Sequence, residues 1–78
     1  MDVTISDSKV ILIEIKSYVN SNGVVIFKRK IDLYSKVTGK SIDRKIIVTP
    51  FIYSRSKDMC IKHGIDVYTS KNIQPYYY

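Results

Sequence analysis

Apolar residues occupy every position of the stretch 10–15 except Glu14, and the stretch is bounded by Ser6-Asp7-Ser8 before it and by residues 17–23 after it. The density of Ile, Val and Leu predicts a buried strand. Glu14 and Lys16 lie one strand period apart, so their side chains should point to the same face. Burying a carboxylate and an ammonium is costly unless they are paired or bind a ligand. This strand end is therefore the first place to look for chemistry.

A second pattern precedes this run. Residues 2–6 alternate polar and apolar side chains, which predicts a half-buried strand, and Asp7-Ser8 predicts the turn of a β-hairpin. A two-residue loop would set Asp2 opposite Ile13, whereas a three-residue loop over 7–9 sets it opposite Glu14. We expect the three-residue loop, because it separates an apolar face from a charged face that carries Asp2, Glu14 and Lys16. The apolar face, which a helix should cover, then holds Val3, Ile5, Ile11, Ile13 and Ile15.

Helical spacing follows in residues 24–38. Asn22 is the expected N-cap and Gly39 the residue that ends the helix. The apolar positions at helical spacing are Val24, Phe27, Ile31, Tyr34 and Val37. The opposite face carries the basic residues Lys28, Arg29, Lys30 and Lys36.

In the second half of the chain, the pattern of apolar residues predicts two more strands and one more helix. Residues 46–48 form a short apolar run before Pro50, typical of a central parallel strand. A helix over 53–63 should end at Gly64, and 65–68 should be the last strand. The fold class is therefore α/β: a mixed sheet made of a hairpin followed by two βα crossovers, which should be right-handed. The tail from residue 69 onward should be irregular.

Composition and charge narrow the function. The 78 residues allow one small domain, and the net charge of +6 suggests a polyanionic partner. Cys60 is the single cysteine, so no disulfide within the chain is possible. No signal peptide opens the chain and no apolar run is long enough to span a membrane, so we expect a cytoplasmic protein with no membrane partner.

Several short segments of the chain, taken in order, resemble a known protein family. Asp2 followed by Glu14-Ile15-Lys16 on two arms of a hairpin resembles the signature of the PD-(D/E)xK nuclease superfamily, and the chain more closely resembles an archaeal family of predicted nucleases of that type. The similarity spans about residues 2–70. The blocks that carry it, in order, are Glu14-Ile15-Lys16-Ser17, Phe27-Lys28-Arg29-Lys30, Ile47-Val48-Thr49-Pro50-Phe51 and Gly64-Ile65-Asp66-Val67-Tyr68.

The resemblance implies a restriction-endonuclease-like sheet between helices, with the site at one end of the hairpin. Members usually begin with a helix and a first strand, which are absent before Asp2, so we expect an N-terminally truncated version. Residues 1–70 would be the nuclease-like core and 71–78 an irregular tyrosine-rich tail.

The candidate chemistry is metal-dependent hydrolysis of phosphodiester bonds in nucleic acid, with DNA the expected substrate. Asp2 and Glu14 would share one Mg²⁺ or Mn²⁺, which prefers carboxylate oxygens and would activate a water molecule. Lys16 would orient that water or stabilise the transition state. Lys28, Arg29 and Lys30 would contact flanking phosphates.

A second function stays open. The chain could be a non-catalytic, nuclease-like module that binds nucleic acid or a protein partner. A homodimer or another homo-oligomer is expected in either case, because the strand 2–6 would be an unprotected sheet edge and because Val10 and Leu12 would lack cover from the chain itself.

Overall fold

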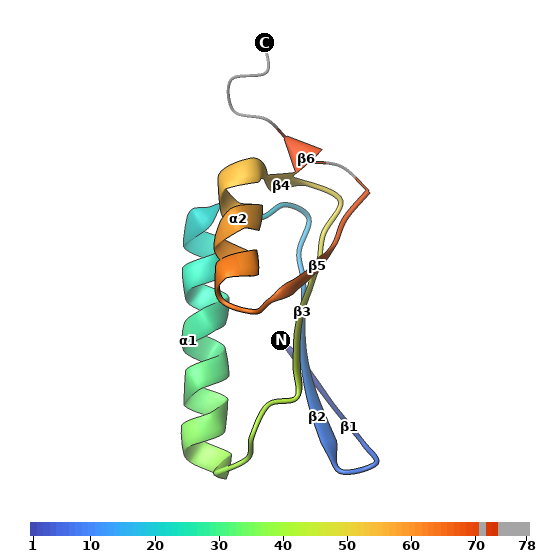
Figure 1. Cartoon of the computed structure of the whole chain (residues 1–78), viewed down its shortest axis with the longest axis vertical. Coiled ribbons are helices and arrows are strands. Elements are labelled where there is room, and N and C mark those ends of the chain that lie inside the picture. The colour runs from blue at the N-terminus through green and yellow to red at the C-terminus, as the bar shows by residue number, and fades with distance from the viewer. Residues whose placement is uncertain (71, 74–78) are drawn as a thin grey trace.

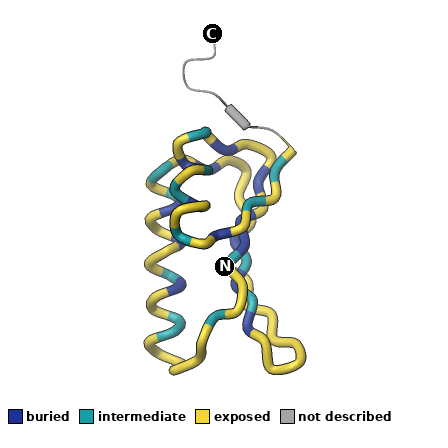
Figure 2. The backbone as a smooth tube through the Cα atoms, viewed as in Figure 1, coloured by how far each residue is buried: buried dark blue, intermediate teal, exposed yellow. Residues whose placement is uncertain are grey.

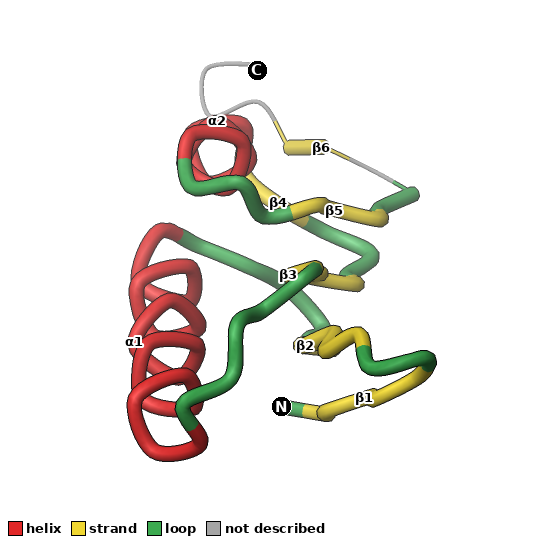
Figure 3. The backbone as a smooth tube through the Cα atoms, turned by 60° about the horizontal axis from the view of Figure 1, so that its bottom comes forward, coloured by secondary structure: helices red, strands yellow, loops and turns green. Residues whose placement is uncertain are grey.

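The computed structural model describes residues 1–70 and 72–73 as two layers, a sheet and a pair of helices. The main sheet has the strand order β1-β2-β3-β5. Its strands are β1 (Asp2–Ser6), β2 (Lys9–Ile15), β3 (Arg44–Val48) and β5 (Asp66–Tyr68). The helices α1 (Ser21–Thr38) and α2 (Ser54–Lys62) lie on the same side of this sheet, and in the described part of the chain no helix covers its other face (Figures 1 and 3).

The predicted topology is confirmed. β1 and β2 form an antiparallel hairpin, and β2, β3 and β5 run parallel, joined by crossovers through α1 and α2. β3 lies between β2 and β5, the central position that the apolar run 46–48 predicts.

The hairpin register differs from the expected one. Asp2 pairs with Ile13 and Ser6 with Lys9, so the loop has two residues rather than three. Asp7 and Ser8 adopt φ values of 51° and 66°, the left-handed conformations of a type I′ turn, whose twist matches the twist of the flanking strands. Such turns usually contain glycine, and because Asp7-Ser8 contains none, the sequence did not indicate a type I′ turn.

The helices cover the face of β2 that was expected to be open. Val10, Leu12 and Glu14 are buried, with exposed fractions of 4%, 0% and 4%, whereas Ile15 on the other face is 67% exposed. The expectation that Val10 and Leu12 lack cover is therefore wrong. So is the expectation that the helix covers the face of Ile11, Ile13 and Ile15, because α1 packs on the alternate side chains.

Helix α1 supplies the largest part of the core. It begins earlier than expected: Asn20, not Asn22, is the N-cap, and its Oδ1 accepts a hydrogen bond of 2.9 Å from the backbone N–H of Gly23. Gly39 ends the helix with a φ of 69°, as predicted. Val24, Phe27 and Ile31 are buried against the sheet.

The remaining elements close the upper end of the molecule in Figure 1. β4 (Ile52–Tyr53) pairs in parallel with β6 (Asn72–Ile73) in a small second sheet. Asn72–Ile73 is thus a strand where an irregular tail was expected, and the rest of the tail (71 and 74–78) lies outside the described residues. Buried positions concentrate between the helices and β2, β3 and β4, whereas β1 is exposed along its whole length (Figure 2). In the described part of the chain, neither helix has the length and apolar character needed to cross a membrane.

Candidate functional site

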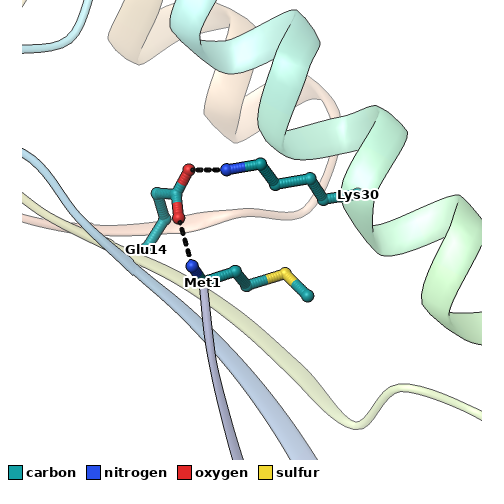
Figure 4. A network of polar contacts seen from close by, with 3 residues as sticks. All are labelled: Met1, Glu14 and Lys30. Atoms are coloured by element: carbon teal, nitrogen blue, oxygen red, sulfur yellow. Dashed lines mark hydrogen bonds and ion pairs between the residues drawn. The ribbon is translucent and has the colours of Figure 1, made fainter.

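Glu14 lies at the centre of a small cluster of charges between β2 and α1. Its side chain is 5% exposed and points from the sheet toward the helix layer (Figure 4). Oε2 accepts a hydrogen bond of 3.0 Å from Nζ of Lys30 on α1. Oε1 lies 3.2 Å from the N-terminal ammonium of Met1, which the hairpin places beside Glu14. Each carboxylate oxygen is therefore held by a positive charge.

These contacts set the ionisation of Glu14. Burial raises the pKa of the carboxyl because it disfavours the charged form. The hydrogen bonds and charges of Lys30 and the N-terminal ammonium act in the opposite direction, and together they hold the pKa of Glu14 below its ordinary value of 4.5. Glu14 is therefore a carboxylate at neutral pH, stabilised by its two partners.

Lys16 follows the last residue of β2 and is exposed to solvent. Its backbone N–H donates a hydrogen bond of 3.0 Å to the carbonyl of Val48, which continues the β2–β3 ladder. Its side chain is exposed and lines a hollow of about 290 Å³ at the start of α1. The other residues lining this hollow are Ser17, Tyr18, Asn20, Asn22, Gly23 and Ile26. The hollow contains hydroxyl and amide groups and no carboxylate.

Asp2 belongs neither to the charge cluster around Glu14 nor to the hollow beside Lys16. It pairs with Ile13, so its side chain lies on the opposite face of the sheet from Glu14, and it is exposed. The facing pair of Asp2 and Glu14 is therefore a wrong prediction, and its cause is the two-residue turn, which shifts the register by one residue and reverses the face.

This arrangement does not fit the expected metal site. A magnesium ion needs hard oxygen ligands with a free lone pair directed at it. Glu14, the acidic side chain of the cluster, has an ammonium group at each oxygen, and these positive charges would repel a cation at the remaining lone pairs, while Asp2 is on the other face. Among residues 1–70 and 72–73, no three His, Cys, Asp or Glu side chains gather where they could hold a metal.

The three consecutive basic residues on α1 do not share one face. Successive residues of a helix are turned by about 100°, so Lys28, Arg29 and Lys30 point in three directions. Lys28 and Arg29 are exposed, and Lys30 turns toward the sheet to contact Glu14. The role of Lys30 as a partner of Glu14 was missed. Its position three residues after Phe27, on the flank of the buried stripe, is the signal that could have revealed it.

The fold and the Glu14-x-Lys16 pair at the end of its second strand are those of a nuclease-like α/β protein. The model of the PD-(D/E)XK nuclease superfamily matches residues 1–67, and the chain belongs to that superfamily. Nucleases of this superfamily act on nucleic acid and generally use divalent metal ions. Comparison with curated proteins and with solved structures finds no match. The narrower resemblance to an archaeal family stays a prediction.

Proposed function

We propose that this protein binds the phosphate backbone of nucleic acid, with DNA as the ligand, at the hollow beside Lys16. The observation that carries the proposal is the different environment of the two charged residues of the Glu14-x-Lys16 pair. The charge of Glu14 is neutralised within the fold by Lys30 and the N-terminal ammonium. Lys16 is left exposed at the rim of a polar hollow that contains no acidic group.

The surroundings of Lys16 support an anionic ligand. The hollow lies at the N-terminus of α1, an 18-residue helix whose first turn has no acidic residue, so the positive end of the helix dipole is not offset there. Asn22 offers a side-chain amide, and Tyr18, 58% exposed, offers a ring on which a base can stack. Lys28 and Arg29, further along the helix, are also exposed, and the net charge of +6 favours encounter with a polyanion.

Substitution of Lys16 by Ala should weaken binding of duplex DNA for all sequences alike. The slope of log affinity against log salt concentration should flatten by about 0.9 for each phosphate that the variant no longer neutralises. The measurement is a fluorescence-anisotropy titration at several salt concentrations. Lys62→Ala at the exposed end of α2 is the matched control, because it removes the same charge away from the hollow. A slope equal to that of the unchanged protein in Lys16→Ala would refute the assignment.

Metal-dependent phosphodiester hydrolysis by Asp2, Glu14 and Lys16 is the second candidate. The observation that favours it is the family match over residues 1–67, within which all three residue types stand in the order of the superfamily signature. Hydrolysis by this trio would require Asp2 to reach the face of Glu14 and a cation to displace Lys30 and the N-terminal ammonium from it. The Lys28, Arg29 and Lys30 set would then supply contacts to flanking phosphates.

A cleavage assay separates the two candidates. We expect DNA binding to persist in EDTA and supercoiled plasmid to stay intact with Mg²⁺ or Mn²⁺. If cleavage occurs, it should require one of these ions and disappear in Glu14→Gln and in Lys16→Ala, while circular dichroism shows that both variants stay folded. Metal-dependent cleavage that disappears in both variants would favour hydrolysis over simple binding.

A further inference from the structure

Within residues 1–70 and 72–73, strand β1 is an unprotected edge of the main sheet. It is the first strand in the order β1-β2-β3-β5, and all five of its residues are exposed. Val3 and Ile5, on the same face as Leu12 and Val10, are 42% and 54% exposed. Edge strands normally carry proline, lysine or a bulge that discourages pairing, and β1 has none of these. Figure 3 shows it as the outermost strand, on the side of β2 that faces away from β3.

The hairpin determines which backbone groups of β1 point outward. Ile5 pairs with Val10. The backbone N–H of Val10 donates a hydrogen bond of 2.7 Å to Oδ2 of Asp43, and the carbonyl of Val10 accepts one of 2.9 Å from the backbone N–H of Asp43. The Ile5–Val10 pair therefore exchanges no hydrogen bonds within the hairpin. In an antiparallel ladder such pairs alternate with hydrogen-bonded ones. The N–H and C=O groups of Val3 and Ile5 consequently point away from β2, toward the free edge.

We propose that a second copy of this chain pairs with β1 in antiparallel fashion about a two-fold axis at Thr4. This register sets Val3 of one copy opposite Ile5 of the other, so the outward backbone groups of both residues exchange hydrogen bonds across the axis. Because opposite residues point to the same face, apolar side chains meet apolar side chains on the helix side. The two sheets then form one continuous sheet of twice as many strands.

The charges of the hairpin are complementary in the same register. Asp2 of one copy lies opposite Ser6 of the other, and Ser6 is paired with Lys9 in its own hairpin. Asp2 and Lys9 of the second copy are then on one face, two strand spacings or roughly 10 Å apart, which a lysine side chain can bridge toward a carboxylate. The two-fold axis produces this pair twice. This complementarity selects a second copy over an unrelated strand.

An apolar hollow next to β1 adds surface to the same contact. It has a volume of about 320 Å³ and is lined by Met1, Lys30, Leu33, Tyr34, Val37 and Thr38. Leu33 and Val37 are 61% and 74% exposed, on the flank of α1 that faces Met1. A two-fold axis perpendicular to the sheet keeps both α1 helices on one side, so the two hollows flank the four paired side chains of Val3 and Ile5.

The test is the mass in solution. Analytical ultracentrifugation at micromolar concentration should give twice the 9.0 kDa of the chain. Ile5→Lys places an ammonium beside Val3 of the second copy and should give a monomer. Ile61→Lys is the matched control, since Ile61 is 66% exposed on α2, away from β1, and this variant should remain a dimer.

Exchanging the charges of Asp2 and Lys9 tests the same interface in a way that does not depend on the folding of Ile5→Lys. Asp2→Lys alone should raise the dimer dissociation constant by about tenfold or more, because like charges then face each other. Adding Lys9→Asp should restore the dimer, whereas a merely structural effect would not be rescued. A monomer for the unchanged protein, or a dimer indifferent to Ile5→Lys and Asp2→Lys, would overturn the proposal. Because no nucleic acid is present, these results are independent of the proposed binding function.

Discussion

Replacing Phe27 by Ala should leave much of the protein unfolded at physiological temperature. Phe27 is fully buried on α1 in the cluster that joins the helix to β2 and β3, so truncation leaves a cavity that the small core cannot close. The expected loss is about 3–5 kcal/mol. A chain of this length has a total stability of only about 4–12 kcal/mol.

Thermal unfolding followed by circular dichroism measures this effect. The expected fall in Tm is at least about 12 °C, since each kcal/mol shifts Tm by roughly 4–8 °C in a domain of this size. Ile61→Ala provides the control, because this apolar side chain is 66% exposed and its loss should change the free energy of unfolding by no more than about 0.5 kcal/mol. Equal effects of the two substitutions would mean that Phe27 is not part of the core.

The elements that were predicted correctly carry strong local signals. Phe27 and Ile31 repeat at helical spacing, Gly39 has the left-handed conformation expected after a helix, and the short run 46–48 has no polar residue and forms most of a central strand. In these segments the local pattern and the tertiary environment favour the same structure, so the sequence alone suffices.

The hairpin register was mispredicted because the separation of an apolar face from a charged face favoured the three-residue loop, whereas the chain adopts the two-residue one. The outcome depends on the conformation of two turn residues, and Asp7 and Ser8 adopt positive φ values that are less common without glycine. A shift of one residue reverses every side chain of β1, which moves Asp2 away from Glu14. The wrong prediction that Asp2 faces Glu14 therefore follows from an error of one residue in a turn.

The face of Glu14 was mispredicted for a different reason. A carboxylate in an apolar strand suggests an open face, since burial of a charge is costly. That cost is offset here by two ammonium groups that come from distant parts of the chain, the N-terminus and Lys30. Such compensation depends on tertiary placement, and no local pattern around Glu14 reveals it.

Removing Lys30 from Glu14 should reduce stability in a way that depends on pH. At pH 7, Lys30→Met should lower the free energy of unfolding by about 1–2 kcal/mol, a value toward the low end for charged hydrogen bonds because Lys30 is partly exposed. The methionine keeps an apolar stem of similar length, so the change isolates the ammonium. Urea unfolding at a series of pH values is the measurement.

The sign of the pH dependence follows from the lowered pKa of Glu14. Above 4.5, its ordinary pKa, the carboxylate is charged in the folded and unfolded states, so its contribution to stability is fully present. Below that pH the unfolded chain takes up the proton first, and the contribution is lost as the pH falls through the folded-state pKa. The unchanged protein and Lys30→Met should therefore converge in stability toward low pH.

Glu14→Gln is the control that assigns this dependence to one residue. Glu14 is the single glutamate, and the six aspartates stay in place, so the difference between the unchanged protein and Glu14→Gln isolates its titration. In the Glu14→Gln background, Lys30→Met should have a small effect that no longer varies between pH 3 and pH 7. A constant difference between the unchanged protein and Lys30→Met over this range would show that Lys30 stabilises the fold by packing rather than by its charge on Glu14.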